Sequence, residues 1–168
     1  TTTGSLAGLS IGEVSGAGAS FVVTVNTGTG DGTLRLDLMD NDTILDTYSA
    51  PLGGLNGGDG SFTSGDVYSL DRTPPTVITI LKLDPDPTAA ETVHFSVIFS
   101  EPVKFIDVSN FALTENGPTG VIIPELSIDG STAIVTVSTG AGNGTLQLSV
   151  VDTDSLFDAV GNPLGGFG

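Results

Sequence analysis

Two acidic stretches of the sequence, DNDTILD at 40–46 and DTDSLFD at 152–158, carry aspartates at the same spacing. Calcium takes about six to eight oxygen ligands, often from carboxylates at alternating positions along one loop. The pattern D-x-D-x-x-x-D can supply three such carboxylates, so it indicates a candidate Ca2+ site in each stretch. The candidate metal ligands are Asp40, Asp42, Asp46, Asp152, Asp154 and Asp158.

A structural interpretation of the two stretches competes with the metal site. An EF-hand loop requires a glycine at its sixth position and a glutamate at its twelfth, and neither stretch has them. Aspartate also stabilises turns by accepting hydrogen bonds from nearby backbone amides. Asp46 and Asp158 each precede a Pro-Leu-Gly-Gly segment, where such a turn is expected. Calcium ligation and turn capping therefore both stay open.

Other residues with chemical potential give weaker signals. Asp84 and Asp86, in LDPDPT, can share a cation with Asp71 across an inter-domain joint, although Asp-Pro is also an ordinary turn opener. His94 is the only histidine, and we expect it on a strand without an acidic partner. The sequence has no nucleophile, zinc-protease or phosphate-loop motif. We therefore expect no enzyme, no catalytic residue and no cofactor other than Ca2+.

Composition narrows the class of partner. The 168 residues include 20 acidic and 4 basic side chains, for a net charge of −16, and no cysteine. Nucleic-acid phosphates and anionic membranes require lysine and arginine, so both are disfavoured, and no apolar run is long enough for membrane insertion. Divalent cations suit such a surface, but acids also merely keep a protein soluble.

The chain contains an internal repeat. Residues 27–54 align without a gap with residues 139–166, an offset of 112, and 14 of the 28 positions are identical. The similarity continues upstream, because TTTG at 1–4 resembles TENG at 114–117 with one residue of slippage. This period is close to the size of one small β-domain.

The repeat predicts two domains joined near Pro74-Pro75, because this pair forces extended backbone. Residues 1–72 are interpreted as the C-terminal half of a repeat. Residues 73–168 are interpreted as a nearly complete repeat that lacks its last strand. The ends of the sequence do not coincide with the boundaries of the repeats, and we therefore expect a longer parent protein.

Alternating apolar residues predict strands at 20–27, 33–40 and 92–100. We expect the first strand to place Phe21, Val23 and Val25 on one face, and the second to point Leu34, Leu36 and Leu38 inward. Asp31-Gly32 and Asn143-Gly144 follow the first strand and its repeat, and such dipeptides favour tight hairpins. No segment has a helical period. The expected fold is all-β, with immunoglobulin-like β-sandwiches in tandem, about one and a half repeats.

Three segments carry a family resemblance: VHFSVIFSEPVKFIDVSNFALTENG at 93–117, GTLQLSVVDTDSLFDAVGNPLGG at 144–166, and the TPPTV joint at 73–77. In combination they resemble bacterial Ig-like repeats of large secreted and cell-surface proteins, similar to the repeats of biofilm-associated proteins and giant adhesins. The resemblance implies a β-sandwich spacer or adhesive module without catalysis. Some related arrays take up calcium near their joints and stiffen. The first copy departs from the pattern, with Ser49-Ala50 in place of Gly161-Asn162.

The expected function is an extracellular structural or adhesive module on a bacterial cell surface, in contact with neighbouring repeats of the same protein. The alternative is a subunit of an extracellular filament or surface layer that exchanges strands with other copies, because unpaired strand edges recruit strands. Carbohydrate binding lacks support, since the chain has no Trp and only two Tyr. We expect residues 1–72, as half a repeat, to expose the inner face of Phe21, Val23, Val25, Leu34 and Leu36, and to pair with another chain or with the second domain.

Overall fold

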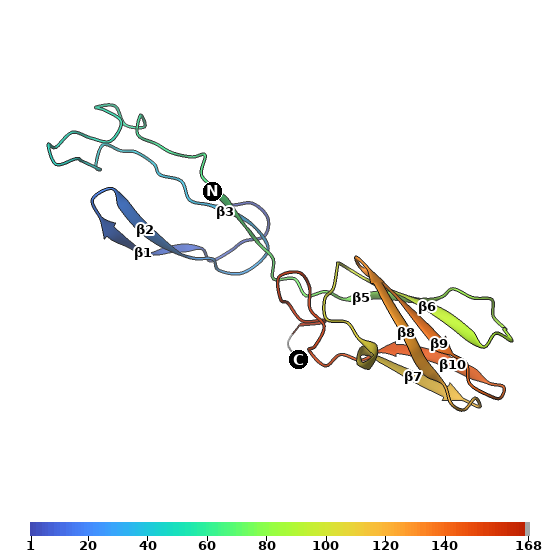
Figure 1. Cartoon of the computed structure of the whole chain (residues 1–168). Helices are drawn as coiled ribbons and strands as arrows, with labels where there is room; N and C mark the ends of the chain where they lie inside the picture. Colours follow the sequence, from blue (N-terminus) through green and yellow to red (C-terminus); the bar gives the residue numbers. More distant parts are fainter. Residues whose placement is uncertain (167–168) are drawn as a thin grey trace. The chain divides into compact units, whose positions relative to one another are not determined.

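Residues 1–166 are described by a computed structural model, and they are all-β, with one turn of 3-10 helix (Figure 1). Every strand pairing is antiparallel, and the all-β prediction is confirmed. The strands are β1 (Ser10–Ala17), β2 (Ser20–Asn26), β3 (Gly32–Arg35), β4 (Val67–Leu70), β5 (Val77–Lys82), β6 (Thr92–Phe99), β7 (Phe111–Asn116), β8 (Ile122–Asp129), β9 (Thr132–Ser138) and β10 (Thr145–Val150). The 3-10 helix η1 spans Val108–Asn110.

The chain divides into two compact units, Thr1–Arg72 and Thr73–Gly168, here called unit 1 and unit 2. In unit 2, β5, β6, β9 and β8 form a four-stranded sheet in that order, and β7 pairs with β10 in a second sheet. Both sheets contribute side chains to one apolar core, as in a β-sandwich.

The core of unit 2 follows from strand alternation. Phe95, Val97 and Phe99 of β6 are buried on one face, as the sequence predicts, because successive strand residues point to opposite faces. β9 contributes Ala133, Val135 and Val137, none of which is exposed to solvent. Phe111 and Leu148 add to the core from the second sheet.

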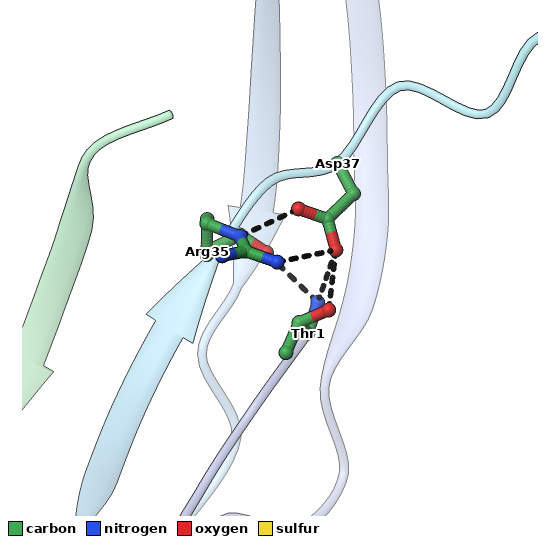
Figure 2. A network of polar contacts seen from close by, with 3 residues as sticks. All are labelled: Thr1, Arg35 and Asp37. Carbon is green, nitrogen blue, oxygen red and sulfur yellow. Dashed lines mark hydrogen bonds and ion pairs between the residues drawn. The ribbon is translucent and has the colours of Figure 1, made fainter. Parts of the chain in front are cut away.

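Unit 1 contains two separate strand pairs, β1–β2 and β3–β4. Thr2 forms an isolated bridge with Leu34, which places the first residues beside β3. Polar contacts hold them there: Asp37 accepts hydrogen bonds from the Arg35 guanidinium at 2.7 Å and from the Thr1 hydroxyl (Figure 2). Arg72 contacts the residues just before β3: its backbone amide donates to Asp31 Oδ1 at 2.6 Å, and its guanidinium donates to the Gly30 carbonyl oxygen.

The hairpins predicted at Asp31-Gly32 and Asn143-Gly144 are wrong. β2 pairs with β1, and β9 with β8 and β6, whereas the strands that follow these dipeptides pair elsewhere. The two glycines serve a close approach of backbones. A Cβ on Gly32 would lie 2.0 Å from the Thr3 carbonyl oxygen, and one on Gly144 would lie 1.9 Å from that of Asn116. The glycine of each dipeptide therefore lets the chain pass close to a neighbouring segment of backbone.

The strand predicted at 33–40 is also shorter than expected, because its partner β4 covers only four residues. Beyond Arg35, a single bridge joins Leu38 to Phe62. Leu36 is 48% exposed, which agrees with the expected exposure of the apolar face of residues 1–72, and Leu38, which was expected to point inward, is 40% exposed. Phe21 is 61% exposed, whereas Val23, Val25 and Leu34 are half-buried.

Candidate functional site

The first two aspartates of each triplet form the same turn. The Asp42 amide donates to Asp40 Oδ1 at 3.1 Å, and the Asp154 amide donates to Asp152 Oδ1 at 3.0 Å. Asp42 and Asp154 both have left-handed backbone, with φ of 63° and 52°. Aspartate tolerates this conformation better than most residues, because its short side chain bonds the local backbone. The recurring Asp-x-Asp pattern thus has a structural cause in both copies.

In unit 1 the turn is covered by a later part of the chain. Asp40 is 8% exposed, its Oδ2 accepts from the Gly60 amide at 3.0 Å, and its own amide donates to the Ser61 hydroxyl. The hydrogen bonds from Gly60 and then from Asp42 hold the pKa of Asp40 below its ordinary value. Asp40 is therefore a charged acceptor that ties residues 40 and 60 together.

The third aspartate of each triplet caps a separate turn. Asp46 Oδ1 accepts from the amides of Tyr48 and Ala50, at 2.8 and 2.9 Å. Asp158 Oδ1 accepts from three amides, those of Val160, Gly161 and Asn162, at 2.6–2.9 Å. The turn interpretation made from sequence therefore has a direct counterpart in these contacts.

Asp158 is the most buried of the six carboxylates, with 1% of its surface exposed. Burial alone would raise its pKa, but the hydrogen bonds from Asn162, Gly161 and Val160 outweigh it and lower the pKa. Asn162 contributes twice, since its side-chain amide also donates to Asp158 Oδ2 at 2.7 Å.

The first copy keeps this turn with fewer bonds. Ala50 stands where Asn162 stands in the second copy, so the side-chain bond to the aspartate is absent. Ser49 occupies the position of Gly161 and has a φ of 68°, a conformation that costs a residue with a Cβ about 1–2 kcal/mol. The Gly-Asn pair is thus dispensable for the turn but strengthens it.

The three carboxylates of a triplet do not gather around one point. Within residues 1–166, neither triplet places three ligand oxygens within 4.8 Å of one another. The structure instead divides each triplet into a pair that forms one turn and a single aspartate that caps the next. Any ion bound here would need further oxygens from carbonyl groups or water.

Asn110 positions the second triplet, a role that the sequence analysis missed. It is 1% exposed, its side-chain amide donates to Ser155 Oγ at 2.8 Å, and its carbonyl accepts from Val151. Asp107 caps η1 by accepting from the Ser109 amide, and its own amide donates to Asn110 Oδ1. The Asp-x-x-Asn spacing at 107–110 is a variant of the capping-box pattern and indicates the cap of η1, whereas the contact with Ser155 has no local sequence signal.

The acids at 84 and 86 are engaged within unit 2. Asp84 Oδ2 accepts from the backbone amide of His94 and lies 3.0 Å from its Nδ1, so the expectation of a histidine without an acidic partner is wrong. The hydrogen bond from the His94 amide is the main cause that lowers the pKa of Asp84. Asp86 pairs with Lys82. These residues border a cavity of about 720 Å³ beside the 139–146 segment.

Comparison with family models, curated proteins and solved structures gave no significant match. Within the described residues, no helix has the length and apolar character needed to cross a membrane.

Proposed function

We propose that this chain is a non-enzymatic, extracellular segment of immunoglobulin-like β-sandwich repeats, which acts as a spacer or adhesion segment of a large bacterial surface protein. The observation that carries the proposal is the recurrence of backbone contacts at the offset of 112 residues. Leu45 bridges Pro51 as Phe157 bridges Pro163, and Ala7 bridges Thr29 as Thr119 bridges Ala141. Stacked copies of one structural unit are the usual basis of extended arrays.

The arrangement of unit 2 supports the immunoglobulin-like part of the proposal. Its two antiparallel sheets enclose one core of β-branched and aromatic side chains, and the chain passes from β9 in one sheet to β10 in the other. The aspartates fit a structural role, since in both copies they serve as acceptors for turn amides.

Force spectroscopy of the full chain between two reference domains tests the proposal. A spacer repeat resists extension, so unit 2 should rupture in one event. Its 96 residues, 73–168, add roughly 30 nm of contour when they extend at about 3.4 Å per residue. Extension of unit 2 without a rupture peak would contradict a mechanical role.

Calcium remains part of the proposal for the loop of unit 1. Asp42 Oδ1 is buried without a hydrogen-bond partner among residues 1–166, which is costly for a carboxylate. The other carboxylate oxygen, Asp42 Oδ2, and the carbonyl oxygen of Asp40 both lie near Gly57, at 3.9 and 4.0 Å from the place that a Cβ would take there. A cation that coordinates Asp42 Oδ1 would give this oxygen the partner it lacks.

Thermal unfolding with millimolar Ca2+, compared with a chelator, tests this site. The backbone amide signals of residues 1–72, followed by NMR on heating, report the unfolding of unit 1. A ligand at about a hundred times its Kd adds roughly 2.7 kcal/mol, which raises the Tm by several degrees. Asp42→Asn should abolish the shift, and the matched Asp154→Asn should not. An equal Tm in both buffers would leave the aspartates as turn acceptors alone.

A filament or surface layer built by strand exchange is the second candidate function. The observation that favours it is the edge of β2, which pairs with no strand other than β1 in the described part of the chain. Size-exclusion chromatography over a range of concentrations tests it, together with negative-stain images. Polymers that grow with concentration support this function, and a monodisperse monomer contradicts it.

A further inference from the structure

The β1–β2 hairpin of unit 1 and the β8–β9 hairpin of unit 2 are equivalent at the offset of 112 residues. β1 begins at Ser10 and β8 at Ile122, and β2 begins at Ser20 and β9 at Thr132. The turns place Gly18 and Gly130 in the same left-handed conformation, with φ of 62° and 60°. Each hairpin also shifts register near its start, between Ile11 and Glu13 and between Ile122 and Glu125.

In unit 2 the hairpin is covered. β6 pairs with the edge of β9 that does not face β8, and Phe95 lies opposite Val135. Ala133, Val135 and Val137 of β9 are fully buried on the core face of this sheet. The strand that completes the hairpin in unit 2 is therefore known, with its register.

In unit 1 the equivalent edge is open. The counterparts of the three buried β9 residues are Phe21, Val23 and Val25, and Phe21 is 61% exposed. Among residues 1–166, all buried hydrophobic side chains belong to unit 2, and unit 1 has none. An exposed strand edge beside apolar side chains is a template for another strand.

We propose that the open edge of β2 binds an antiparallel strand with the chemistry of β6, in the register that β6 adopts on β9. This inference rests on the repeat organisation of the proposed function. It places Val97 of such a strand opposite Phe21, Phe95 opposite Val23, and Val93 opposite Val25. The strand adds main-chain hydrogen bonds to β2 and covers its apolar face.

The bound strand is a β6-like segment that is not already part of a folded unit. It is not β6 of a second folded copy of this chain. In unit 2, β6 is paired on both edges, with β5 and with β9, and Phe99 is 1% exposed. A folded copy could release this strand only by opening its own core. The residues of β6 also include no carboxylate and no lysine or arginine, so the strand adds no negative charge to a chain of net charge −16.

The test uses the full chain and a synthetic peptide of residues 92–100, TVHFSVIFS, with a neutral solubilising tag and a fluorescent label. Fluorescence anisotropy measures binding, and hydrogen exchange measures protection of the β2 amides. We expect saturable binding and slower exchange across residues 20–26. Protection elsewhere on the chain, or no binding, would overturn the proposal.

Two matched pairs of variants test the register. In the peptide, Phe95→Asn should weaken binding at least tenfold, because this side chain covers Val23, whereas His94→Asn on the opposite face should have little effect. The peptide variants leave the folding of the chain unchanged. In the chain, Val23→Asn should weaken binding and Thr24→Asn should not. Equal effects within both pairs would overturn the proposed face.

Sedimentation of the chain without peptide supplies the remaining outcome. If the chain forms a dimer as its concentration rises, and β2 is protected in that dimer, the occupant is a second copy. This outcome would overturn the proposal of a separate β6-like strand. The rupture of unit 2 in force spectroscopy does not depend on β2. If the peptide does not bind but unit 2 still ruptures in one event, this inference is wrong and the proposed function still stands.

Discussion

At the scale of single residues, the aspartates differ more between copies than their identical spacing suggests. Asp158 is buried and bonds three backbone amides and one side chain, whereas Asp46 is exposed and bonds two amides. Desolvation makes a lost hydrogen bond more costly in the buried position, because water cannot replace the acceptor. Aspartates at equivalent positions of the two copies thus contribute unequally to the free energy of unfolding.

This difference predicts unequal effects of matched substitutions. Asp158→Ala should lower the free energy of unfolding of unit 2 by about 2–3 kcal/mol, since it leaves three amides and the Asn162 side chain without their acceptor. Asp46→Ala should cost unit 1 about 0.5–1 kcal/mol, as for an exposed cap. Urea unfolding, followed by the backbone amide NMR signals of each unit, measures both losses. Equal losses would contradict the dominance of burial.

At the scale of elements, the path from β9 to β10 depends on close backbone packing. Gly144 does not have left-handed backbone, yet a Cβ there would lie 1.9 Å from the Asn116 carbonyl oxygen and 2.6 Å from Pro118. The loop and β7 therefore approach each other at a distance that only glycine permits.

Gly144→Ala should accordingly destabilise unit 2 by about 3 kcal/mol or more, because a backbone oxygen has to move. The control is Gly130→Ala, at a turn where the added Cβ meets no atom within 4 Å. Its cost is only the left-handed conformation, about 1–2 kcal/mol. Thermal unfolding of unit 2 by circular dichroism compares them, and a larger loss for Gly130→Ala would argue against the steric cause.

Alternation predicted the core strands well, because β6 and β9 are covered on a defined face and their side chains obey a period of two. Alternation alone could not predict how far Leu36 and Leu38 are covered, because their exposure depends on the length of the partner strand and not on their own pattern. β1 was missed, since its glycines and exposed side chains give little periodicity. Asp-Gly and Asn-Gly were assigned to hairpins because local propensity cannot show that the next strand joins another sheet.

For the aspartates, the sequence pattern indicated both calcium ligation and turn capping, but it could not show which atoms are in contact. Turn capping depends on amides within four residues, so it could be predicted at Asp46 and Asp158. The contact of Asp40 with Gly60 and the pair of Asp84 with His94 depend on chain paths that local patterns do not encode.

At the scale of the whole molecule, the charge of −16 coexists with carboxylates that must remain ionised. Hydrogen bonds or ion pairs lower the pKa of Asp37, Asp40, Asp84, Asp107 and Asp158. The remaining acids repel one another across the surface, and this repulsion weakens as salt increases. Acid therefore has two opposed effects: it relieves repulsion and it removes acceptors.

The balance of these effects predicts the acid limit of the fold. A carboxylate with a lowered pKa contributes stability that is present above its unfolded pKa, near 3.9, and is lost as pH falls through its lower folded pKa. Unfolding free energies measured in urea should therefore hold or rise slightly from pH 7 to about pH 5, and fall below about pH 4. Asp84→Asn keeps an acceptor for the His94 amide but cannot titrate, so its acid loss should be shallower than that of the unmodified chain. Parallel curves would show that Asp84 adds nothing to the acid transition. A chain whose stability rises steadily to pH 3 would show that charge repulsion, and not the loss of acceptors, governs its response to acid.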